Sequence, residues 1–284
     1  MQVVLVASSG PVDRVSLDHG IQTLEALGFS VEESLACQKS SISYLSASDD
    51  ERLAALQAAL AQRKITWAAR GGYGLTRILP GLNLSDLHSV VIGFSDTGAL
   101  LLHLWKHKHI HSIHASTVMR IADEPAETHA ALLQILRGCA RNVKYPVVKA
   151  LNPFATSKIE GTLIACNLSV LTALVGTSSM PVLNRTILIL EEVGEAPYRI
   201  DRMLTQLHHS SSLKDVSAIV LGHMTDCSEN AVDVFVERVT AFGIPLFGSL
   251  PVGHESPNWP IPVGVKASLE LIDDNYQLRI LSEI

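Results

Sequence analysis

Ser95 lies where the chain changes from one kind of sequence to another. Residues 89–92 before it form a short β-branched run that is typical of a buried strand, and the apolar residues 97–105 after it are typical of a helix. A serine at such a sharp turn has its hydroxyl raised clear of the sheet, beside the free N–H groups of the helix start. The turn Gly93-Phe94-Ser95-Asp96 therefore predicts a nucleophile, although its spacing is not Gly-x-Ser-x-Gly. The alternative is that Ser95 only caps the helix.

An acid and a base follow two other predicted strands. Glu191 and Glu192 end the apolar run 187–190, and His254 follows residues 250–253. Active sites of open α/β sheets gather at such strand ends, so these residues are candidates for a triad in which the histidine takes the proton of the serine. Adjacent strand residues point to opposite faces, and the pattern does not choose between Glu191 and Glu192. A solvated strand-end carboxylate is the alternative for either glutamate.

The glycine-rich segment Arg70-Gly71-Gly72-Tyr73-Gly74 follows a further strand-like run, residues 65–69. Glycines allow positive φ and close backbone approach, so this loop can direct N–H groups at an anion. The backbone N–H groups of Gly72 and Asp96 are candidates for an oxyanion hole. A plain tight turn is one alternative, and a phosphate loop is another that lacks the Lys-Ser/Thr of a P-loop. Arg70 either pairs with a substrate carboxylate or ties down the loop.

These residues need a framework of alternating elements. Up to about residue 140 the pattern predicts a parallel sheet covered on both faces, with strands at 3–7, 30–34, 65–69, 89–94 and 110–114 and helices at 16–28, 50–62, 97–107 and 127–138. From about residue 160 it predicts a smaller mixed α/β domain, with helices at 168–176, 197–209 and 229–242 and strands at 186–192, 216–222, 266–272 and 276–281. The expected division is a domain 1–141 with the nucleophile, a crossing 142–160, and a domain 161–284 with the acid and histidine.

The composition excludes several classes of protein. Of 284 residues 47% are hydrophobic and 18% charged, which argues against disorder. The net charge of −6 provides no basic surface for nucleic acid. No apolar run approaches the roughly 18 residues that would suggest a membrane span. The first residues lack a basic region and their apolar stretch is too short for a signal peptide, so a cytoplasmic location is expected.

Neither the cysteines nor the histidines predict a metal site. The cysteines Cys37, Cys139, Cys166 and Cys227 are scattered without a C-x-x-C pair, so we expect buried thiols and no disulfide framework. Cys166 is an alternative nucleophile without an adjacent base. His103 and His107 have i,i+4 spacing but no H-E-x-x-H pattern, and His109, His111 and His114 follow outside that helix.

Taken in order along the chain, these segments resemble the LD-carboxypeptidase family of muramoyltetrapeptide carboxypeptidase-like serine peptidases. The similarity covers residues 3–9, 24–29, 49–53, 70–74, 93–96, 160–162, 167–168, 176–177, 190–191, 197–204, 253–255 and 261–264. The resemblance implies a flavodoxin- or Rossmann-like N-terminal domain, a barrel-like C-terminal domain and a site in the cleft between them. It selects Glu191 as the acid beside Ser95 and His254, so Glu192 is expected to be the solvated carboxylate. It also places oxyanion donors at Gly72 and Asp96. Asn167, like Arg70, is a candidate contact to the substrate.

The activity that the resemblance implies is hydrolysis of the L-to-D amide of cytosolic murein tetrapeptides. Terminal D-alanine would leave through Ser-His-Glu acyl-enzyme chemistry, as in peptidoglycan recycling, without a metal or organic cofactor. The implied partners are a small muropeptide substrate and a second copy of the chain in a homodimer, with no nucleic acid and no membrane.

The chain departs from the family pattern at three places: Thr97-Gly98, Ala115-Ser116-Thr117 and Ala165-Cys166. All three lie near the expected site, so the resemblance predicts the residues of the triad more firmly than it predicts the substrate. A microcin-resistance-type peptidase acting on peptidyl or aminoacyl nucleotides is one alternative. A catalytically inactive relative that binds a small molecule is another.

Overall fold

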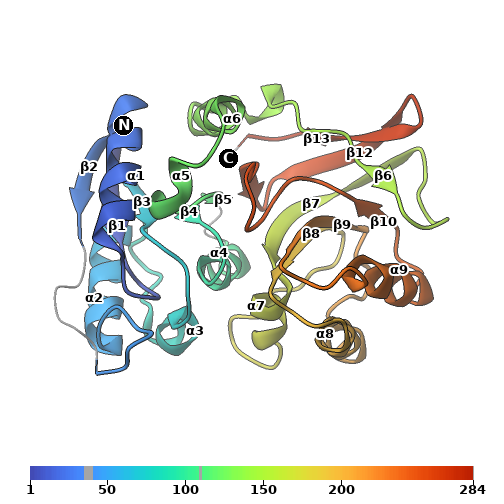
Figure 1. Ribbon diagram of the computed structural model, residues 1–284, viewed down its shortest axis with the longest axis horizontal. Coiled ribbons are helices and arrows are strands. Elements are labelled where there is room, and N and C mark those ends of the chain that lie inside the picture. Colours follow the sequence, from blue (N-terminus) through green and yellow to red (C-terminus); the bar gives the residue numbers. More distant parts are fainter. Residues whose placement is uncertain (35–40, 109–110, 284) are drawn as a thin grey trace.

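Two sheets stand side by side in the computed structural model, and helices cover their outer faces (Figure 1). The structure describes residues 1–34, 41–108 and 111–283. Cys37 and His109 lie outside the described residues, as does the start of the strand predicted at 110–114.

The first sheet has the strand order β11-β5-β4-β3-β1-β2. All neighbours in it pair in parallel except β11, which is antiparallel to β5. The order 2-1-3-4-5 is that of flavodoxin-like folds, which confirms the predicted N-terminal architecture. Its strands are β1 (Gln2–Val6), β2 (Ser30–Glu33), β3 (Ile65–Ala68), β4 (Val90–Gly93), β5 (Ser112–His114) and β11 (Ile261–Val263).

Helices connect these strands. Four of them lie close to where the sequence predicts them, and two short ones, at residues 75–78 and 118–121, were not predicted. They are α1 (Arg14–Ala26), α2 (Asp49–Leu60), α3 (Leu75–Ile78), α4 (Thr97–Lys106), α5 (Val118–Ile121) and α6 (Ala126–Leu136), with short 3₁₀ turns at Leu79–Gly81 and Ala140–Asn142. Helix α2 begins at a capping box, in which Ser48 and Glu51 satisfy each other's backbone N–H groups. Crossover connections of this kind bring the carboxyl ends of β3 and β4 to one edge of the sheet.

The second sheet has the order β13-β12-β7-β8-β9-β10-β6. Strands β7 to β10 are parallel, and a bridge between Val148 and Tyr276 brings the two ends of the sheet together. The sheet is therefore nearly closed, as the predicted barrel-like second domain requires. Its elements are β6 (Lys149–Ala150), β7 (Lys158–Asn167), α7 (Leu168–Ala173), β8 (Thr186–Val193), α8 (Pro197–His209), β9 (Ala218–Thr225), α9 (Ala231–Ala241), β10 (Leu246–Gly248), β12 (Lys266–Ile272) and β13 (Asn275–Ile280).

Strand β7 is missing from the sequence-based prediction. A Cβ at Gly161 would lie 2.9 Å from the carbonyl oxygen of Arg185, so this position in β7 favours glycine. When only the sequence is considered, a glycine is typical of a turn, and this is why β7 was not predicted. Strand β11 returns the chain to the first sheet, although it comes from the part predicted to form the second domain. The division at residues 142–160 stays a prediction.

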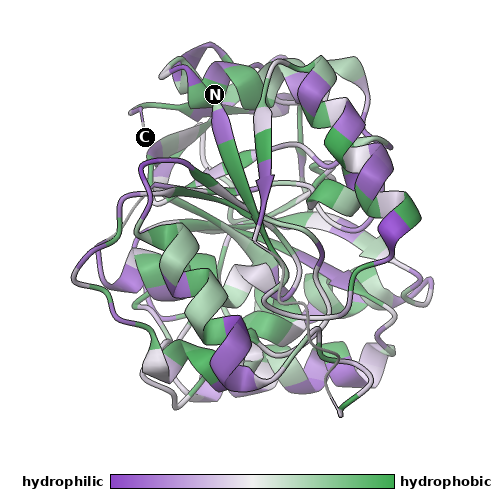
Figure 2. Cartoon of the chain, turned by 90° about the vertical axis from the view of Figure 1, so that its left-hand side faces the viewer, coloured by the Kyte–Doolittle hydropathy of each residue, from purple (hydrophilic) through white to green (hydrophobic). Residues whose placement is uncertain are grey.

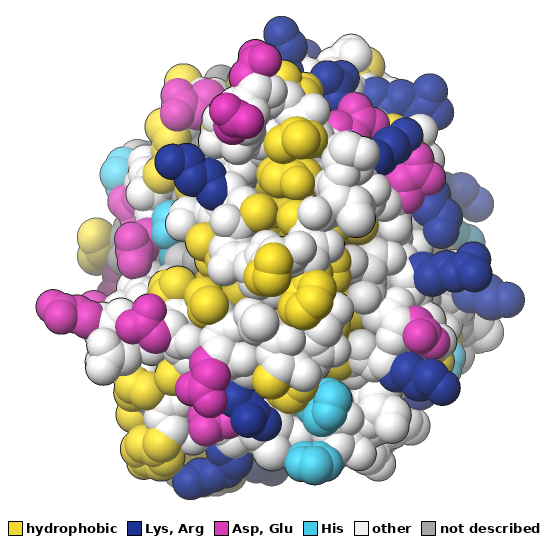
Figure 3. Space-filling model, turned by 90° about the vertical axis from the view of Figure 1, so that its right-hand side faces the viewer, with side chains coloured by type: hydrophobic (Ala, Val, Ile, Leu, Met, Phe, Trp, Pro, Cys, Tyr) yellow, Lys and Arg dark blue, Asp and Glu magenta, His cyan; other side chains and the backbone are white. Residues whose placement is uncertain are grey.

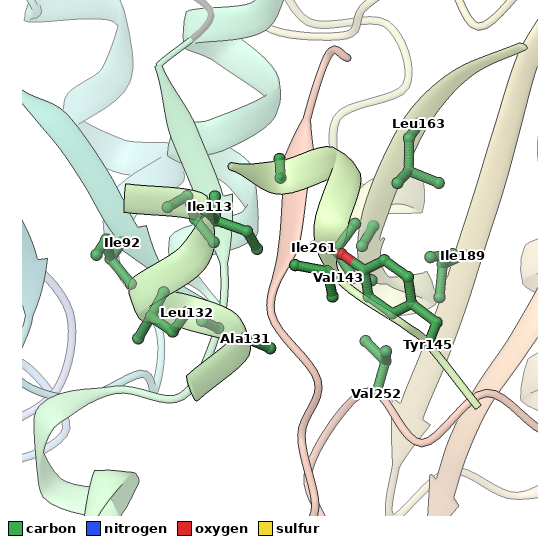
Figure 4. Packing of buried hydrophobic residues seen from close by; sticks show 14 of the residues in the cluster. Ile92, Ile113, Ala131, Leu132, Val143, Tyr145, Leu163, Ile189, Val252 and Ile261 are labelled. Atoms are coloured by element: carbon green, nitrogen blue, oxygen red, sulfur yellow. The ribbon is translucent and has the colours of Figure 1, made fainter. Parts of the chain in front are cut away.

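One hydrophobic core continues from the first sheet into the second. Figure 4 shows Ile92 and Ile113 of the first sheet on one side of this cluster and Leu163 and Ile189 of the second on the other, with Tyr145 between them. The Tyr145 hydroxyl donates to the Pro260 carbonyl at 2.9 Å. Figure 2 shows the apolar strands inside and mixed polar helices outside. The shared core fixes the strand ends of the two sheets relative to each other.

The surface at the right of Figure 1 mixes hydrophobic side chains with both kinds of charge (Figure 3). Within the described part of the chain, no helix has the length and apolar character needed to cross a bilayer.

Candidate active site

Ser95 occupies a strained turn between β4 and α4. Its φ is +60°, a left-handed conformation that is uncommon outside glycine and that recurs at nucleophile turns. The Thr97 N–H donates to the Phe94 carbonyl at 3.2 Å, and the Gly98 N–H donates to the Ser95 carbonyl at 2.8 Å. These bonds hold the turn, and Ser95 lines an open cavity.

His254 lies between Ser95 and Glu191. Its Nε2 is 3.2 Å from Ser95 Oγ, and its Nδ1 is 2.7 Å from Glu191 Oε2. The Phe94 ring packs against the imidazole with a centroid separation of 4.8 Å. The structure thus brings the three predicted side chains together, Ser95 from the turn after β4, Glu191 from the carboxyl-terminal part of β8 and His254 from the loop after β10. The strand expected at residues 250–253 is not formed, so His254 extends from a loop and not from a strand end. In this order of contacts a histidine can take a serine proton while an acid holds its other nitrogen.

The acid is positioned by an irregularity in β8. The register between β8 and β9 shifts between Leu190 and Glu192, and such bulges redirect side chains next to sites. Glu191 is fully buried. Gly253 has φ +132°, and a Cβ there would lie 2.9 Å from Glu191 Oε2. Only a glycine allows the histidine loop to approach the acid this closely.

The expectation that Glu192 is a solvated carboxylate is wrong. Glu192 is 1% exposed and accepts hydrogen bonds from Asn167 Nδ2 at 2.9 Å, from the Ser169 N–H at 2.8 Å and from the Val193 N–H at 2.8 Å. Burial raises the pKa of this carboxyl, and the hydrogen bonds oppose that rise. Glu192 therefore fastens the start of α7 to β8.

Asn167 is not brought to the cavity. Its Oδ1 accepts from the Val170 N–H at 3.1 Å and from Ser169 Oγ at 2.6 Å, so the side chain caps α7. It is 3% exposed and does not contribute to the cavity lining. Its polar atoms are engaged in the fold, which corrects the expected contact with substrate.

The glycine-rich loop packs directly on the nucleophile. A Cβ at Gly71 would lie 2.9 Å from Ser95 Oγ, and Gly72 has φ +120°. The backbone N–H groups of Gly72 and Asp96 donate to no other group in the described ranges of the chain. Two unpaired N–H groups beside a serine hydroxyl are suited to stabilising a developing oxyanion.

Two buried charged side chains support this arrangement, and neither role was evident from the sequence. Asp96 accepts from Ser9 Oγ at 2.6 Å and from the Leu75 N–H at 3.0 Å, and burial raises its pKa. Arg52 donates to the carbonyl groups of Ser8 and Gly74. Together they tie the β1 turn, the glycine-rich loop and the serine turn to one another. Arg52 follows Asp49-Asp50-Glu51 and Asp96 stands between Ser95 and Thr97, so the local sequence does not mark either side chain as buried.

The cavity beside Ser95 has a volume of about 470 Å³, within the range of small-ligand sites. Its lining contains Ser16, Arg70, Gly71, Gly72, Phe94, Ser95, Thr117, Met119, Arg120, Asp123 and His254. Arg70 lines it and also donates to the Pro11 carbonyl at 2.7 Å, so it performs the loop-tying role and remains beside the cavity. Arg120 also lines the cavity, and the sequence did not predict it as a site residue. Neither Arg70 nor Arg120 has an ion-pair partner among the residues described.

Other titratable groups are kept from the chemistry by burial. His114 is fully buried behind Phe94, and burial lowers its pKa to about 3, so it stays neutral and adds no charge near His254. Cys166 is also fully buried, which raises the pKa of its thiol and makes it a poor nucleophile. Within residues 1–34, 41–108 and 111–283 no group of three or more His, Cys, Asp or Glu side chains is arranged to hold a metal ion.

Comparison with known proteins assigns the family. The LD-carboxypeptidase N-terminal domain profile matches residues 3–115, and the C-terminal domain profile matches residues 160–269. The chain belongs to the LD-carboxypeptidase family. The murein tetrapeptide carboxypeptidase of Pseudomonas aeruginosa is 34% identical over 80% of this chain and 80% of that protein.

Two solved structures have the same fold as this chain. Muramoyltetrapeptide carboxypeptidase from Oxalobacter formigenes aligns with a TM-score of 0.86 at 28% identity, over 100% of this chain and 99% of that one. MccF in complex with glutamyl sulfamoyl guanosine aligns with a TM-score of 0.83 at 19% identity, over 100% of this chain and 96% of that one. At this identity the similarity shows a common fold and nothing more.

The two adjacent glutamates should respond differently to loss of charge. Glu191→Gln is expected to lower turnover by about 10⁴-fold with the fold intact, because an amide can hold the wrong histidine tautomer. Glu192→Gln should leave turnover nearly unchanged but lower the free energy of unfolding by about 1–3 kcal/mol, because its amide nitrogen would face a buried donor. Steady-state kinetics and urea unfolding of both variants test this. A greater loss of turnover in Glu192→Gln would reverse the assignment.

Proposed function

We propose that this family member is a serine carboxypeptidase that cleaves the L-to-D amide of murein tetrapeptides and releases terminal D-alanine. The observation that carries the proposal is the position of His254, within hydrogen-bonding distance of both Ser95 Oγ and Glu191 Oε2. The names of the murein tetrapeptide and muramoyltetrapeptide carboxypeptidases to which the chain is similar support the substrate class.

The acylation step follows from this geometry. Ser95 Oγ attacks the carbonyl carbon of the scissile amide while its proton passes to His254 Nε2. Glu191 stabilises the imidazolium through Nδ1–H, and the N–H groups of Gly72 and Asp96 donate to the oxyanion. The C–N bond then breaks, and His254 returns the proton to the departing amine of D-alanine.

Deacylation repeats these steps with water. His254 takes a proton from a water molecule that attacks the acyl-enzyme carbonyl, and the second tetrahedral intermediate collapses with return of the proton to Ser95 Oγ. The shortened peptide leaves with a new terminal carboxylate. Neither half of the reaction requires a metal ion or an organic cofactor.

Two arginines give the cavity the charge that a carboxypeptidase needs. Arg70 and Arg120 both line it, and a guanidinium binds a carboxylate through paired N–H donors. The free carboxylate of terminal D-alanine is the anion that every substrate of this class carries. We further propose that the substrates are free cytosolic muropeptides, because a peptide released from the wall can enter a cavity of about 470 Å³ more readily than a polymer.

Replacement of the nucleophile should abolish turnover and spare the fold. Ser95→Ala is expected to lower kcat by about 10⁶-fold, as removal of a triad serine does elsewhere. His254→Ala should behave similarly, because an unassisted serine hydroxyl is a poor nucleophile at neutral pH. A fluorophosphonate probe, followed by mass spectrometry of the intact protein and its peptides, should label wild type at Ser95 and fail with Ser95→Ala. Wild-type rates in Ser95→Ala would end the serine-enzyme proposal.

The substrate can be tested with four compounds. The purified protein should release D-alanine from a free tetrapeptide that ends in a diamino acid and D-alanine. Little activity is expected on polymeric murein, on the D-Ala–D-Ala bond of the pentapeptide or on an all-L peptide. Liquid chromatography of the products measures each.

An aminoacyl-nucleotide analogue, as a fifth compound, tests the alternative substrate class, and variants of Arg120 and Arg137 test how the substrate carboxylate is bound. Preferred cleavage of the all-L peptide or of an aminoacyl-nucleotide analogue would reject the murein assignment while leaving the triad intact. In the assay with the tetrapeptide, Arg120→Gln should raise KM about tenfold or more if the Arg120 guanidinium binds the terminal carboxylate of the substrate. Arg137→Gln, an exposed site outside the cavity lining, is the matched control.

A further inference from the structure

The loop that carries His254 is fastened from within by Asn258. This residue is 2% exposed, and its Oδ1 accepts from the Gly253 N–H at 2.9 Å. Gly253 immediately precedes His254 and packs on Glu191. The Asn258 side chain therefore holds the peptide from which the imidazole extends toward its two partners.

Asn258 is itself held by two buried side chains from the other half of the chain. Its backbone N–H donates to Glu124 Oε2 at 2.8 Å, and its Nδ2 donates to Ser116 Oγ at 3.2 Å. Ser116 Oγ donates to Glu124 Oε1 at 2.5 Å, which closes the ring of contacts. Ser116 is 2% exposed and Glu124 8% exposed. We name these three residues the anchor triangle.

The anchor triangle is continuous with the wall of the cavity. Ser116 and Glu124 bound the segment that contains the cavity residues Thr117, Met119, Arg120 and Asp123. This segment is tied to the first sheet, because Trp67 Nε1 donates to the Ser116 carbonyl at 2.9 Å and the Met119 N–H donates to the Ala69 carbonyl at 3.0 Å. One rigid piece thus forms the cavity wall and holds the histidine loop.

We propose that Glu124, Ser116 and Asn258 are positioning residues that keep His254 aligned with Ser95 across the boundary between the two sheets. The inference rests on the proposed serine chemistry. Ser95 extends from the first sheet and Glu191 from the second, so the imidazole meets both only if its loop is fixed to both. A buried carboxylate suits this task, since its oxygens accept from a hydroxyl of one half and a backbone N–H of the other.

Removing the anchor should lower reactivity more than binding. Asn258→Ala and Glu124→Ala are expected to reduce kcat about 10- to 100-fold, the effect of a displacement near 1 Å, with KM within about twofold of wild type. Both should slow fluorophosphonate labelling of Ser95 by a similar factor, because labelling needs the histidine but no peptide. All rates are measured well below the melting temperature of each variant.

Two further variants separate positioning from general stability. Glu127→Ala removes an equal charge from an exposed site on α6 and should leave both rates unchanged. Glu124→Gln keeps a carbonyl oxygen for the Asn258 N–H, so it should recover about fivefold or more of the rate lost in Glu124→Ala. It also serves as the test if the alanine variants fail to fold.

The possible failures are distinguishable. If wild type itself is not labelled at Ser95, the proposed function fails. If wild type is labelled and the anchor variants lose thermal stability but keep kcat and the labelling rate, the anchor triangle is only structural and the inference is wrong. A rise in KM with unchanged kcat would also overturn it.

Discussion

The hydrogen bond between His254 Nε2 and Ser95 Oγ connects the two halves of the molecule. Their strands form two separate sheets, and the two sheets share one hydrophobic core. At 3.2 Å, the hydrogen bond requires that the end of β4 and the loop after β10 keep their relative position closely. Neither sheet sets that distance alone. The continuous apolar cluster around Tyr145 and the return of β11 to the first sheet supply the rigidity.

Buried polar groups then adjust the site within this apolar frame. Asp96 and Arg52 join the loops of the first sheet around Ser95, while Glu192 and Asn167 join β8 to α7 behind Glu191. Each buried charge is compensated by hydrogen bonds to neighbouring groups, which such burial requires. The result is a preorganised site that needs little rearrangement before a nucleophile can act.

The three departures from the family pattern are each accommodated by packing. A Cβ at Gly98 would lie 3.7 Å from the Cβ of Cys166, so two of the departures face each other where α4 meets β7. The third contains Ser116, whose hydroxyl connects Glu124 and Asn258. These substitutions leave the contacts among Ser95, Glu191 and His254 in place. The geometry therefore supports an active enzyme over an inactive binding relative.

The sequence by itself determined the alternating strands, the flavodoxin-like first sheet and the strand ends near which Ser95 and Glu191 lie. These features depend on local periodicity and on turn residues such as Gly93, which a single chain displays directly. Tertiary structure alone decided that Glu192 is buried and that Asn167 caps a helix. It also decided that Gly161 lies inside a strand, and that Arg120, Glu124 and Asn258 surround the site. These outcomes depend on contacts between residues far apart in the chain, and the hydrogen-bond partner of a buried polar group is set by whatever the fold places beside it.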